Sequence, residues 1–286
     1  MTRWLVTGSA GMLGQDLVAV LDQAGHEVTP APRSALDVTD LPACRVAVRG
    51  HDVVVNAAAW TAVDDAETCE TQAFAVNATG AANVARACAE AGAQLVQVST
   101  DYVFAGDARS PYDESAAQAP RSAYGRTKAA GEWAVTALCP RSWVVRTAWL
   151  YGSGGPNFVS TMARLAAERE TLEVVDDQRG QPTWTVDVAR AVERLVTGSA
   201  PYGAYHATSA GETTWYGLAR EVFAGLGLDP DRVRPTTTAA FPRPAPRPAY
   251  SVLSPRAWEQ AGLPALPAWR RALAEAFRTE GDAFRA

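Results

Sequence analysis

The chain is poor in the residues that build metal centres and disulfide frameworks. It has only three histidines, and no two of them have a spacing typical of metal ligands. Its four cysteines lie far apart without a Cys-x-x-Cys pair, at Cys44, Cys69, Cys88 and Cys139. We therefore expect no zinc site and four unpaired thiols in a reducing compartment, which indicates a cytoplasmic protein.

Long apolar runs and basic clusters are missing as well. No window approaches the roughly 20 apolar residues of a membrane span, and the first apolar run is too short for a signal sequence. The 31 acidic residues outnumber the 26 basic ones, which gives a net charge of −5. Neither a membrane nor a nucleic acid is an expected partner, because both would require a basic patch.

Short apolar segments alternate with helical patterns over the first 150 residues, which predicts strands and helices in turn. The expected strands are 3–8, 26–31, 52–59, 93–100 and 142–151, and the expected helices are 12–24, 66–92 and 122–138. Runs that are apolar throughout are typical of strands covered on both faces. This alternation predicts an α/β fold with a doubly wound parallel sheet of the Rossmann type.

The rhythm changes after residue 150, which predicts a smaller C-terminal α/β domain for the substrate. We expect a helix at 157–169, a strand at 172–175 and a helix from an N-cap at Thr185 to about 197. The proposed division is 1–150 for the cofactor domain, with 177–200 returning to it, and mainly 151–286 for the substrate domain.

The proline-rich stretch 229–255 is expected to be a loop. It carries Arg243, Arg247 and Tyr250, which are unusual for a passive linker. Arg247 is therefore a candidate ligand for an anionic substrate.

A glycine-rich motif follows the first expected strand. Gly8, Gly11 and Gly14 form a G-x-x-G-x-x-G pattern that includes Met12 and Leu13 and opens a helix. Glycines allow a tight turn and a close backbone approach, and the helix N-terminus offers free N–H groups to a diphosphate. At this position the motif predicts a dinucleotide site.

The end of the second strand bears on the choice of cofactor. An acidic side chain there would bind the ribose 2′-hydroxyl of NADH, whereas an arginine suits the 2′-phosphate of NADPH. This chain has Arg33 and no acid before Asp37. The residues favour NADPH and leave NADH open.

The stretch Ser122-Ala123-Tyr124-Gly125-Arg126-Thr127-Lys128 places a tyrosine and a lysine on one helical face. A nearby ammonium is expected to lower the pKa of the phenol toward working pH, where it could transfer a proton. Thr100 ends the strand upstream and could bind the same substrate oxygen. Together with the glycine motif, these three residues predict a catalytic site.

At this point the chain resembles the extended short-chain dehydrogenase/reductases, and within them the dTDP-4-dehydrorhamnose reductase family. The resemblance runs nearly end to end. Its segments are "GSAGMLG" (8–14), "LDVTD" (36–40), "VVNAAAWTAVDDAE" (54–67), "VNATGAANVA" (76–85), "VSTDYVFAG" (98–106), "YGRTK" (124–128), "RTAWLYG" (146–152), "DDQRGQPTW" (176–184) and "RPAYSVLS" (247–254).

The resemblance implies a role for each matching residue. Tyr124 would be the proton donor, Lys128 would bind the nicotinamide ribose and tune Tyr124, and Thr100 would adjust the proton transfer. The implied cofactor contacts are Gly11, Met12 and Leu13 at the diphosphate, Asp37 and Val38 at the adenine, and Ala59, Trp60 and Thr61 further along. The implied contacts to a deoxysugar nucleotide are Thr100, Asp101 and Trp149.

Four alternatives stand beside reduction of dTDP-4-dehydrorhamnose. A sugar-nucleotide 4,6-dehydratase is disfavoured because Tyr102 stands where such enzymes carry a glutamate, and an epimerase matches "STDYVF" and "RTAWLYG" less well. A non-catalytic subunit similar to the regulatory subunit of methionine adenosyltransferase is the alternative from another class. Reductases of neighbouring dTDP-keto-sugars in antibiotic pathways also remain open.

Two departures from the family pattern limit what the resemblance implies. The strand end "TPAPR" (29–33) differs from the acid-bearing one of some relatives, and Ser254 stands where many members have aspartate. The acidic residues with which some members bind Mg²⁺ at a dimer interface cannot be identified in the sequence. Mg²⁺ and a homodimer therefore stay open.

Overall fold

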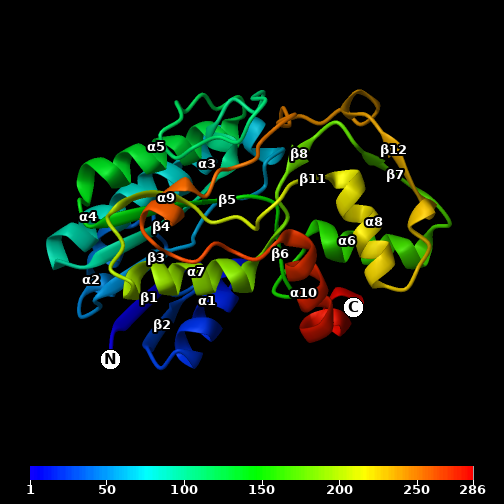
Figure 1. Cartoon of the computed structure of the whole chain (residues 1–286). Coiled ribbons are helices and arrows are strands. Elements are labelled where there is room, and N and C mark those ends of the chain that lie inside the picture. The colour runs from blue at the N-terminus through cyan, green and yellow to red at the C-terminus, as the bar shows by residue number, and fades with distance from the viewer. Residues whose placement is uncertain (286) are drawn as a thin grey trace.

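A parallel sheet of six strands forms the centre of the molecule (Figure 1), whose computed structural model describes residues 1–285. The order of the strands is β10-β5-β4-β3-β1-β2. Their bounds are β1 Arg3–Thr7, β2 Glu27–Ala31, β3 Val53–Asn56, β4 Gln94–Thr100, β5 Ser142–Thr147 and β10 Gly203–His206. Every pairing in this sheet is parallel, as the sequence predicted.

Helices cover both faces of the sheet, which is the doubly wound arrangement. One face carries α1 (Met12–Gln23) and α7 (Thr185–Thr197), whose apolar side chains share a core with Trp4, Val55 and Trp143. The other face carries α2 (Leu41–Val48), α4 (Ala81–Ala91) and α5 (Ala123–Leu138). The alanines of α4 allow close packing, and three of the cysteines are buried.

A smaller α/β part lies beside the sheet, on the right in Figure 1. Its helices are α6 Phe158–Glu168, α8 Trp215–Gly225 and α10 Trp269–Arg285, and its paired strands are β7 Leu172–Val175 and β12 Val233–Thr236. The short pairs are β6 Leu150–Tyr151 with β9 Thr183–Trp184, and β8 Arg179–Gly180 with β11 Thr213–Thr214. These elements enclose a core of their own, which includes Trp184, Phe223 and Leu273.

Two predicted elements are interrupted in the structure. The expected helix at 66–92 is a 3-10 turn at Asp65–Glu67, α3 (Glu70–Phe74), a π-helical turn at Ala75–Gly80 and then α4. The expected strand at 142–151 stops after Thr147, because Trp149 has a φ of 47° that no strand can continue. Both interruptions lie next to candidate site residues.

Several smaller predictions were also wrong. Thr185 is the first residue of α7 and not its N-cap, and its hydroxyl donates to the carbonyl of Tyr151. The proline-rich stretch contains β12 as well as loop, since Pro235 can stand in a strand that is paired on one side. Helix α2, β10 and the short helix α9 (Arg256–Gln260) were not predicted. Strand β2 lies at an edge and is largely exposed, not covered on both faces.

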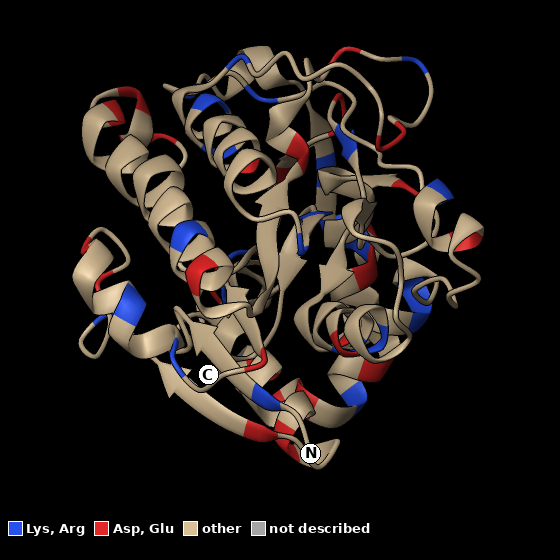
Figure 2. Ribbon diagram, turned by 90° about the vertical axis from the view of Figure 1, so that its left-hand side faces the viewer, with Lys and Arg blue, Asp and Glu red and all other residues tan. Residues whose placement is uncertain are grey.

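Charged residues of both signs are interspersed over the ribbon in the view of Figure 2. Of the helices in residues 1–285, none is long and apolar enough to cross a membrane.

Candidate functional site

The turn after β1 is built for close contact. Gly8 has a φ of 64°, and a Cβ atom there would lie 2.7 Å from the backbone nitrogen of Ala58. At Gly14 a Cβ atom would lie 2.7 Å from Ser9 Cα and closer still to the carbonyl oxygen of Gly8. The glycines therefore let α1, the turn and the end of β3 approach each other, as the motif predicted.

The N-terminus of α1 is available for an anion. Gly11 is the N-cap residue and has no side chain that could cap the helix, so N–H groups of the first turn stay free. The loop at 152–157 lies over this end, since Gln15 Nε2 donates to Gly154 O at 2.9 Å and Asn157 Nδ2 lies 3.8 Å from Met12 Sδ. This cradle fits a diphosphate group. Leu13, by contrast, buries its side chain in the core.

The predicted adenosine end lies beyond β2. Arg33 is exposed. Asp37 Oδ1 accepts two hydrogen bonds from Thr39, one from its N–H at 2.9 Å and one from Oγ1 at 2.7 Å. These hydrogen bonds lower the pKa of Asp37. Val38 places its side chain in the core against Gly80, so only its backbone could face an adenine. Arg33 is an exposed cation at this end, and its contact to a 2′-phosphate stays a prediction.

Buried polar side chains link the strand ends below the cofactor cradle. Thr7 Oγ1 donates to Asn56 Oδ1 at 2.6 Å, and Asn56 Nδ2 donates to Gln97 Oε1 at 2.8 Å. These hydrogen bonds pair buried polar groups on three neighbouring strands, so β1, β3 and β4 are fixed relative to one another.

Asn77 is a site residue that the sequence reasoning missed. It lies in the π-helical turn and brackets Trp60, accepting from its N–H at 2.8 Å and donating to its carbonyl at 3.1 Å. Its Nδ2 also donates to Thr127 Oγ1 on α5. Asn77 therefore holds the segment with Ala59, Trp60 and Thr61 against the helix of the catalytic pair. A helical pattern gives no signal for such a turn.

The predicted catalytic residues come together where β4 meets α5. Thr100 Oγ1 donates to Asp101 Oδ1 at 2.9 Å, and the Thr100 hydroxyl is also a hydrogen-bonding neighbour of Tyr124. Lys128 Nζ donates to the carbonyl of Val98 at 2.6 Å, two residues before Thr100 on the same strand. Ser122 caps α5 by accepting a hydrogen bond from the N–H of Gly125 at 3.1 Å. This cap fixes the start of the helix and therefore the position of Tyr124 in its first turn.

The pKa of Tyr124 departs from the sequence-based expectation. Burial raises it to about 12, and the Thr100 hydroxyl only partly opposes this effect. Lys128 is not among the groups that shift the phenol, since its ammonium is bound to Val98 O. The expected lowering was therefore wrong for the protein without a ligand. A phenol with a raised pKa keeps its proton at neutral pH, as a proton donor must.

Lys128 is the only lysine in the chain, and all other basic side chains are arginines. It is 4% exposed, and burial lowers the pKa of its ammonium to about 8, although Glu132 acts in the opposite direction. An arginine at this position would stay charged at every relevant pH and would carry a larger planar head. The single lysine side chain of the chain therefore lies buried as a compact cation, hydrogen-bonded to the strand that ends at Thr100.

Asp101 is a buried carboxyl group with a perturbed pKa. Burial raises the pKa to about 6, while the hydroxyls of Ser251 and Thr100 act against this shift. A carboxyl group that titrates near neutrality beside a phenol is typical of a functional cleft.

Trp149 and Arg247 are held by partners of their own. The Trp149 ring stacks on Trp215 with 3.5 Å between the centroids, and a Cβ atom at Gly180 would lie 2.6 Å from its Nε1. Arg247 Nη2 forms an ion pair with Asp64 Oδ2 at 2.8 Å. No contact of the described residues joins Trp149 to Tyr124, so a substrate contact by Trp149 stays a prediction.

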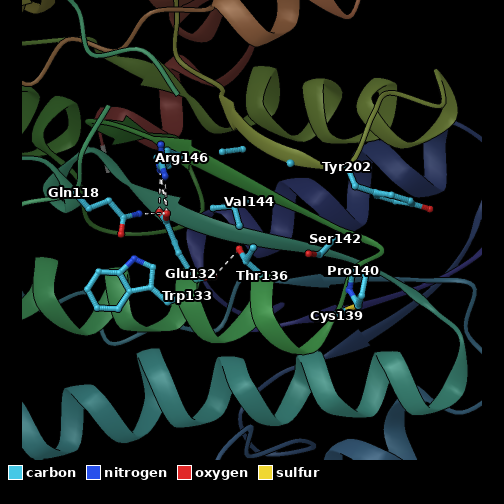
Figure 3. A pocket seen from close by; sticks show the side chains of 12 residues that line it. Gln118, Glu132, Trp133, Thr136, Cys139, Pro140, Ser142, Val144, Arg146 and Tyr202 are labelled. Atoms are coloured by element: carbon cyan, nitrogen blue, oxygen red, sulfur yellow. Dashed lines mark hydrogen bonds and ion pairs between the residues drawn. The ribbon is translucent and has the colours of Figure 1, made fainter. Parts of the chain in front are cut away.

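The hollow drawn in Figure 3 lies elsewhere, between α5 and the strands β5 and β10. It measures about 340 Å³, and none of the predicted site residues lines it. At its base Arg146 and Glu132 form a buried ion pair at 2.8 Å. Arg146 also meets the imidazole of His206, whose pKa burial lowers to about 3. In residues 1–285, no group of three His, Cys, Asp or Glu side chains could hold a metal ion.

Known proteins resemble this chain over nearly its whole length. The RmlD substrate binding domain family matches residues 2–281. A dTDP-4-dehydrorhamnose reductase of Streptomyces griseus is 54% identical over 282 residues, which cover 96% of this chain and 93% of the relative. The chain belongs to the dTDP-4-dehydrorhamnose reductase family.

Two further relatives bear on the cofactor and the substrate. The crystal structure of the Bacillus anthracis dTDP-4-dehydrorhamnose reductase in complex with NADP matches with a TM-score of 0.94, at 37% identity, over 97% of this chain and 99% of that one. A dTDP-4-keto-6-deoxy-D-glucose reductase of Streptomyces niveus is 51% identical over 96% of each chain. The reductase family therefore includes close relatives named for different keto sugars.

Proposed function

We propose that this reductase converts the 4-keto group of a dTDP-4-dehydro-6-deoxy-L-hexose to an alcohol with NADPH, and specifically dTDP-4-dehydrorhamnose to dTDP-L-rhamnose. The observation that carries the proposal is the cluster of Thr100, Tyr124 and Lys128 at the end of β4, beside a glycine turn that fits a diphosphate. The 54% identity to a relative named for this reaction supports the choice of sugar.

The residues divide the work between binding and proton transfer. The turn formed by Gly8, Gly11 and Gly14 would hold NADPH, Arg33 would be the candidate partner of its 2′-phosphate, and the bound cofactor would supply the hydride. Tyr124 keeps its proton because its pKa is raised, and it donates this proton to the sugar oxygen as negative charge develops there. Thr100 binds the same oxygen. Lys128, whose ammonium donates to Val98 O beside these residues, would bind the nicotinamide ribose.

A related keto sugar is the second candidate substrate. The relative of Streptomyces niveus, at 51% identity, is named for dTDP-4-keto-6-deoxy-D-glucose. Its identity to this chain is close to that of the relative named for dehydrorhamnose. An antibiotic-sugar pathway is therefore kept as the alternative to rhamnose.

Turnover with a panel of keto sugar nucleotides tests the proposal. We expect oxidation of NADPH, followed by its absorbance, with dTDP-4-dehydrorhamnose as substrate. Oxidation should be slower when dTDP-4-keto-6-deoxy-D-glucose replaces this substrate, and slower when NADH replaces NADPH. Replacement of Tyr124 by phenylalanine should reduce kcat by at least about 10³-fold, since general acid catalysis contributes 10²–10⁴, while the Kd of NADPH stays within twofold. Undiminished reduction by Tyr124→Phe would refute the assignment of the proton donor.

The same assay separates the enzyme from a non-catalytic subunit. NADPH that binds but is not oxidised with any keto sugar nucleotide would favour a subunit similar to the regulatory subunit of methionine adenosyltransferase. We further infer a cytoplasmic location from the four unpaired thiols. Sedimentation and activity in the presence of a chelator would decide the two points that the sequence leaves open, a homodimer and a dependence on Mg²⁺.

A further inference from the structure

A proline-rich strap runs from the C-terminal part of the chain to the catalytic residues. We define the strap as residues 242–250, Pro-Arg-Pro-Ala-Pro-Arg-Pro-Ala-Tyr, which belongs to the orange segment at the top of Figure 1 between β12 and α9. Every second residue from 242 to 248 is proline, which fixes its own φ and keeps the preceding residue extended. The strap is stiff for this reason, so a few contacts are enough to set its position.

A single carboxylate anchors most of this strap. Asp64 Oδ2 pairs with Arg247 Nη2 at 2.8 Å and with Arg243 Nε at 3.8 Å, and the N–H of Ala245 donates to Asp64 Oδ1 at 3.2 Å. Every hydrogen bond or ion pair between residues 242–248 and the rest of the described chain ends on Asp64. Backbone hydrogen bonds to the rest of the protein begin only after residue 248, for example from Tyr250 N to Gly106 O at 2.9 Å.

The anchor lies beside the catalytic group. Arg247 and Asp64 both act electrostatically on the buried phenol of Tyr102. The Tyr102 ring packs edge-on against the ring of Tyr124, with 5.6 Å between the centroids. Just beyond the strap, Ser251 hydrogen-bonds Asp101. The strap therefore lies close to Tyr124, on the side of Tyr102, and a sugar nucleotide that takes its proton from Tyr124 would lie near the strap.

Two hydrogen bonds hold the Arg247 guanidinium and leave its other N–H groups for further contacts. Its Nη1 donates to Ala245 O at 3.1 Å and its Nη2 to Asp64, which uses two of the five N–H groups of a guanidinium. The side chain is 17% exposed, so the protein does not cover it completely. A guanidinium fixed in this way binds a diphosphate well, because less conformational freedom is lost on binding.

We propose that Asp64 is a positioning residue for the substrate: it fixes the strap beside the catalytic residues and holds the Arg247 guanidinium ready for the diphosphate of the sugar nucleotide. The inference rests on the proposed function for the identity of the substrate. Asp64 itself is expected to touch neither the sugar nor the cofactor.

The test compares Asp64→Asn with Asp65→Asn. Asp65 is the exposed neighbour, and it forms no ion pair with the strap among the described residues, so both variants lose one charge at nearly the same place. We expect Asp64→Asn to raise the KM of the keto sugar nucleotide and the Kd of dTDP about tenfold, which is the effect of one charge-assisted hydrogen bond. The Kd of NADPH should stay within twofold, and kcat should fall less than KM rises.

Two further measurements separate positioning from a general effect on folding. Hydrogen exchange at the N–H of Ala245 should be faster in Asp64→Asn than in wild type and in Asp65→Asn, and Asp64→Glu should recover part of the dTDP affinity. The double variant Asp64→Asn/Arg247→Ala should bind dTDP no more weakly than Arg247→Ala alone, since Asp64 acts through Arg247.

The outcomes distinguish this inference from the proposed function. A dTDP affinity and an Ala245 exchange rate in Asp64→Asn that equal those of Asp65→Asn would overturn the role of Asp64, whatever the turnover. Wild type that oxidises no NADPH with any keto sugar nucleotide would overturn the proposed function, while exchange and dTDP binding would still decide the role of Asp64.

Discussion

Replacement of Gly14 by alanine should damage both the fold and the cofactor site. The new Cβ atom would lie 2.7 Å from Ser9 Cα and closer still to Gly8 O, and both neighbours are backbone atoms of the phosphate turn. Overpacking against atoms that cannot rotate away costs about 3 kcal/mol. The gain in helix propensity from glycine to alanine returns only about 1 kcal/mol. The net loss is therefore about 2 kcal/mol.

Thermal unfolding and NADPH titration measure this loss. In a chain of this size, 2 kcal/mol lowers the melting temperature by about 4–8 °C, and the displaced turn should weaken NADPH binding at least about tenfold. Gly281→Ala is the matched control, because no atom lies within 4 Å of its Cβ position in α10. The control should be neutral or slightly stabilising. A Gly14→Ala protein that melts with the wild type would refute the reasoning from close packing.

Two further predictions concern buried charges. Arg146→Met leaves Glu132 buried without its cationic partner and should lower the free energy of urea unfolding by about 3–5 kcal/mol. The control Arg164→Met, at an exposed ion pair, should lower it by less than about 1 kcal/mol. Equal losses in the two variants would contradict this reasoning. Because the pKa of Asp101 is raised to about 6, its protonated form is favoured by folding, and this stability is complete below pH 4 and lost as pH rises through 6. Asp101→Asn should thus melt higher than wild type at pH 8 but not at pH 4, with reduced turnover; a difference independent of pH would contradict the burial of this charge.

The sequence predicted the parts of the fold that depend on local pattern. Strands β1, β3, β4 and β5 each contain an apolar run, and α1 and α5 follow helical patterns that a single chain reveals. The interruptions escaped prediction because they depend on contacts made elsewhere. The π-helical turn is held by Asn77 through Trp60 and Thr127, and a periodic pattern contains no mark of these partners.

The candidate site was predictable to the same degree. Tyr124, Lys128 and Thr100 follow from spacing and from their place at a strand end, and they lie together in the structure. The direction of the Tyr124 pKa was not predictable, because burial outweighs a neighbouring ammonium that is bound elsewhere. The pairing of Asp64 with Arg247 joins residues that are 183 positions apart, and neither position carries a signal of the other.

The single lysine gives this enzyme a built-in spectroscopic reporter. Protein made with ¹⁵N-lysine as the only labelled amino acid would show one backbone amide signal in a two-dimensional spectrum, and that signal would come from Lys128 in α5. No assignment experiment would be needed. Each addition of nucleotide, sugar or inhibitor could then be followed at the active site itself, one resonance at a time.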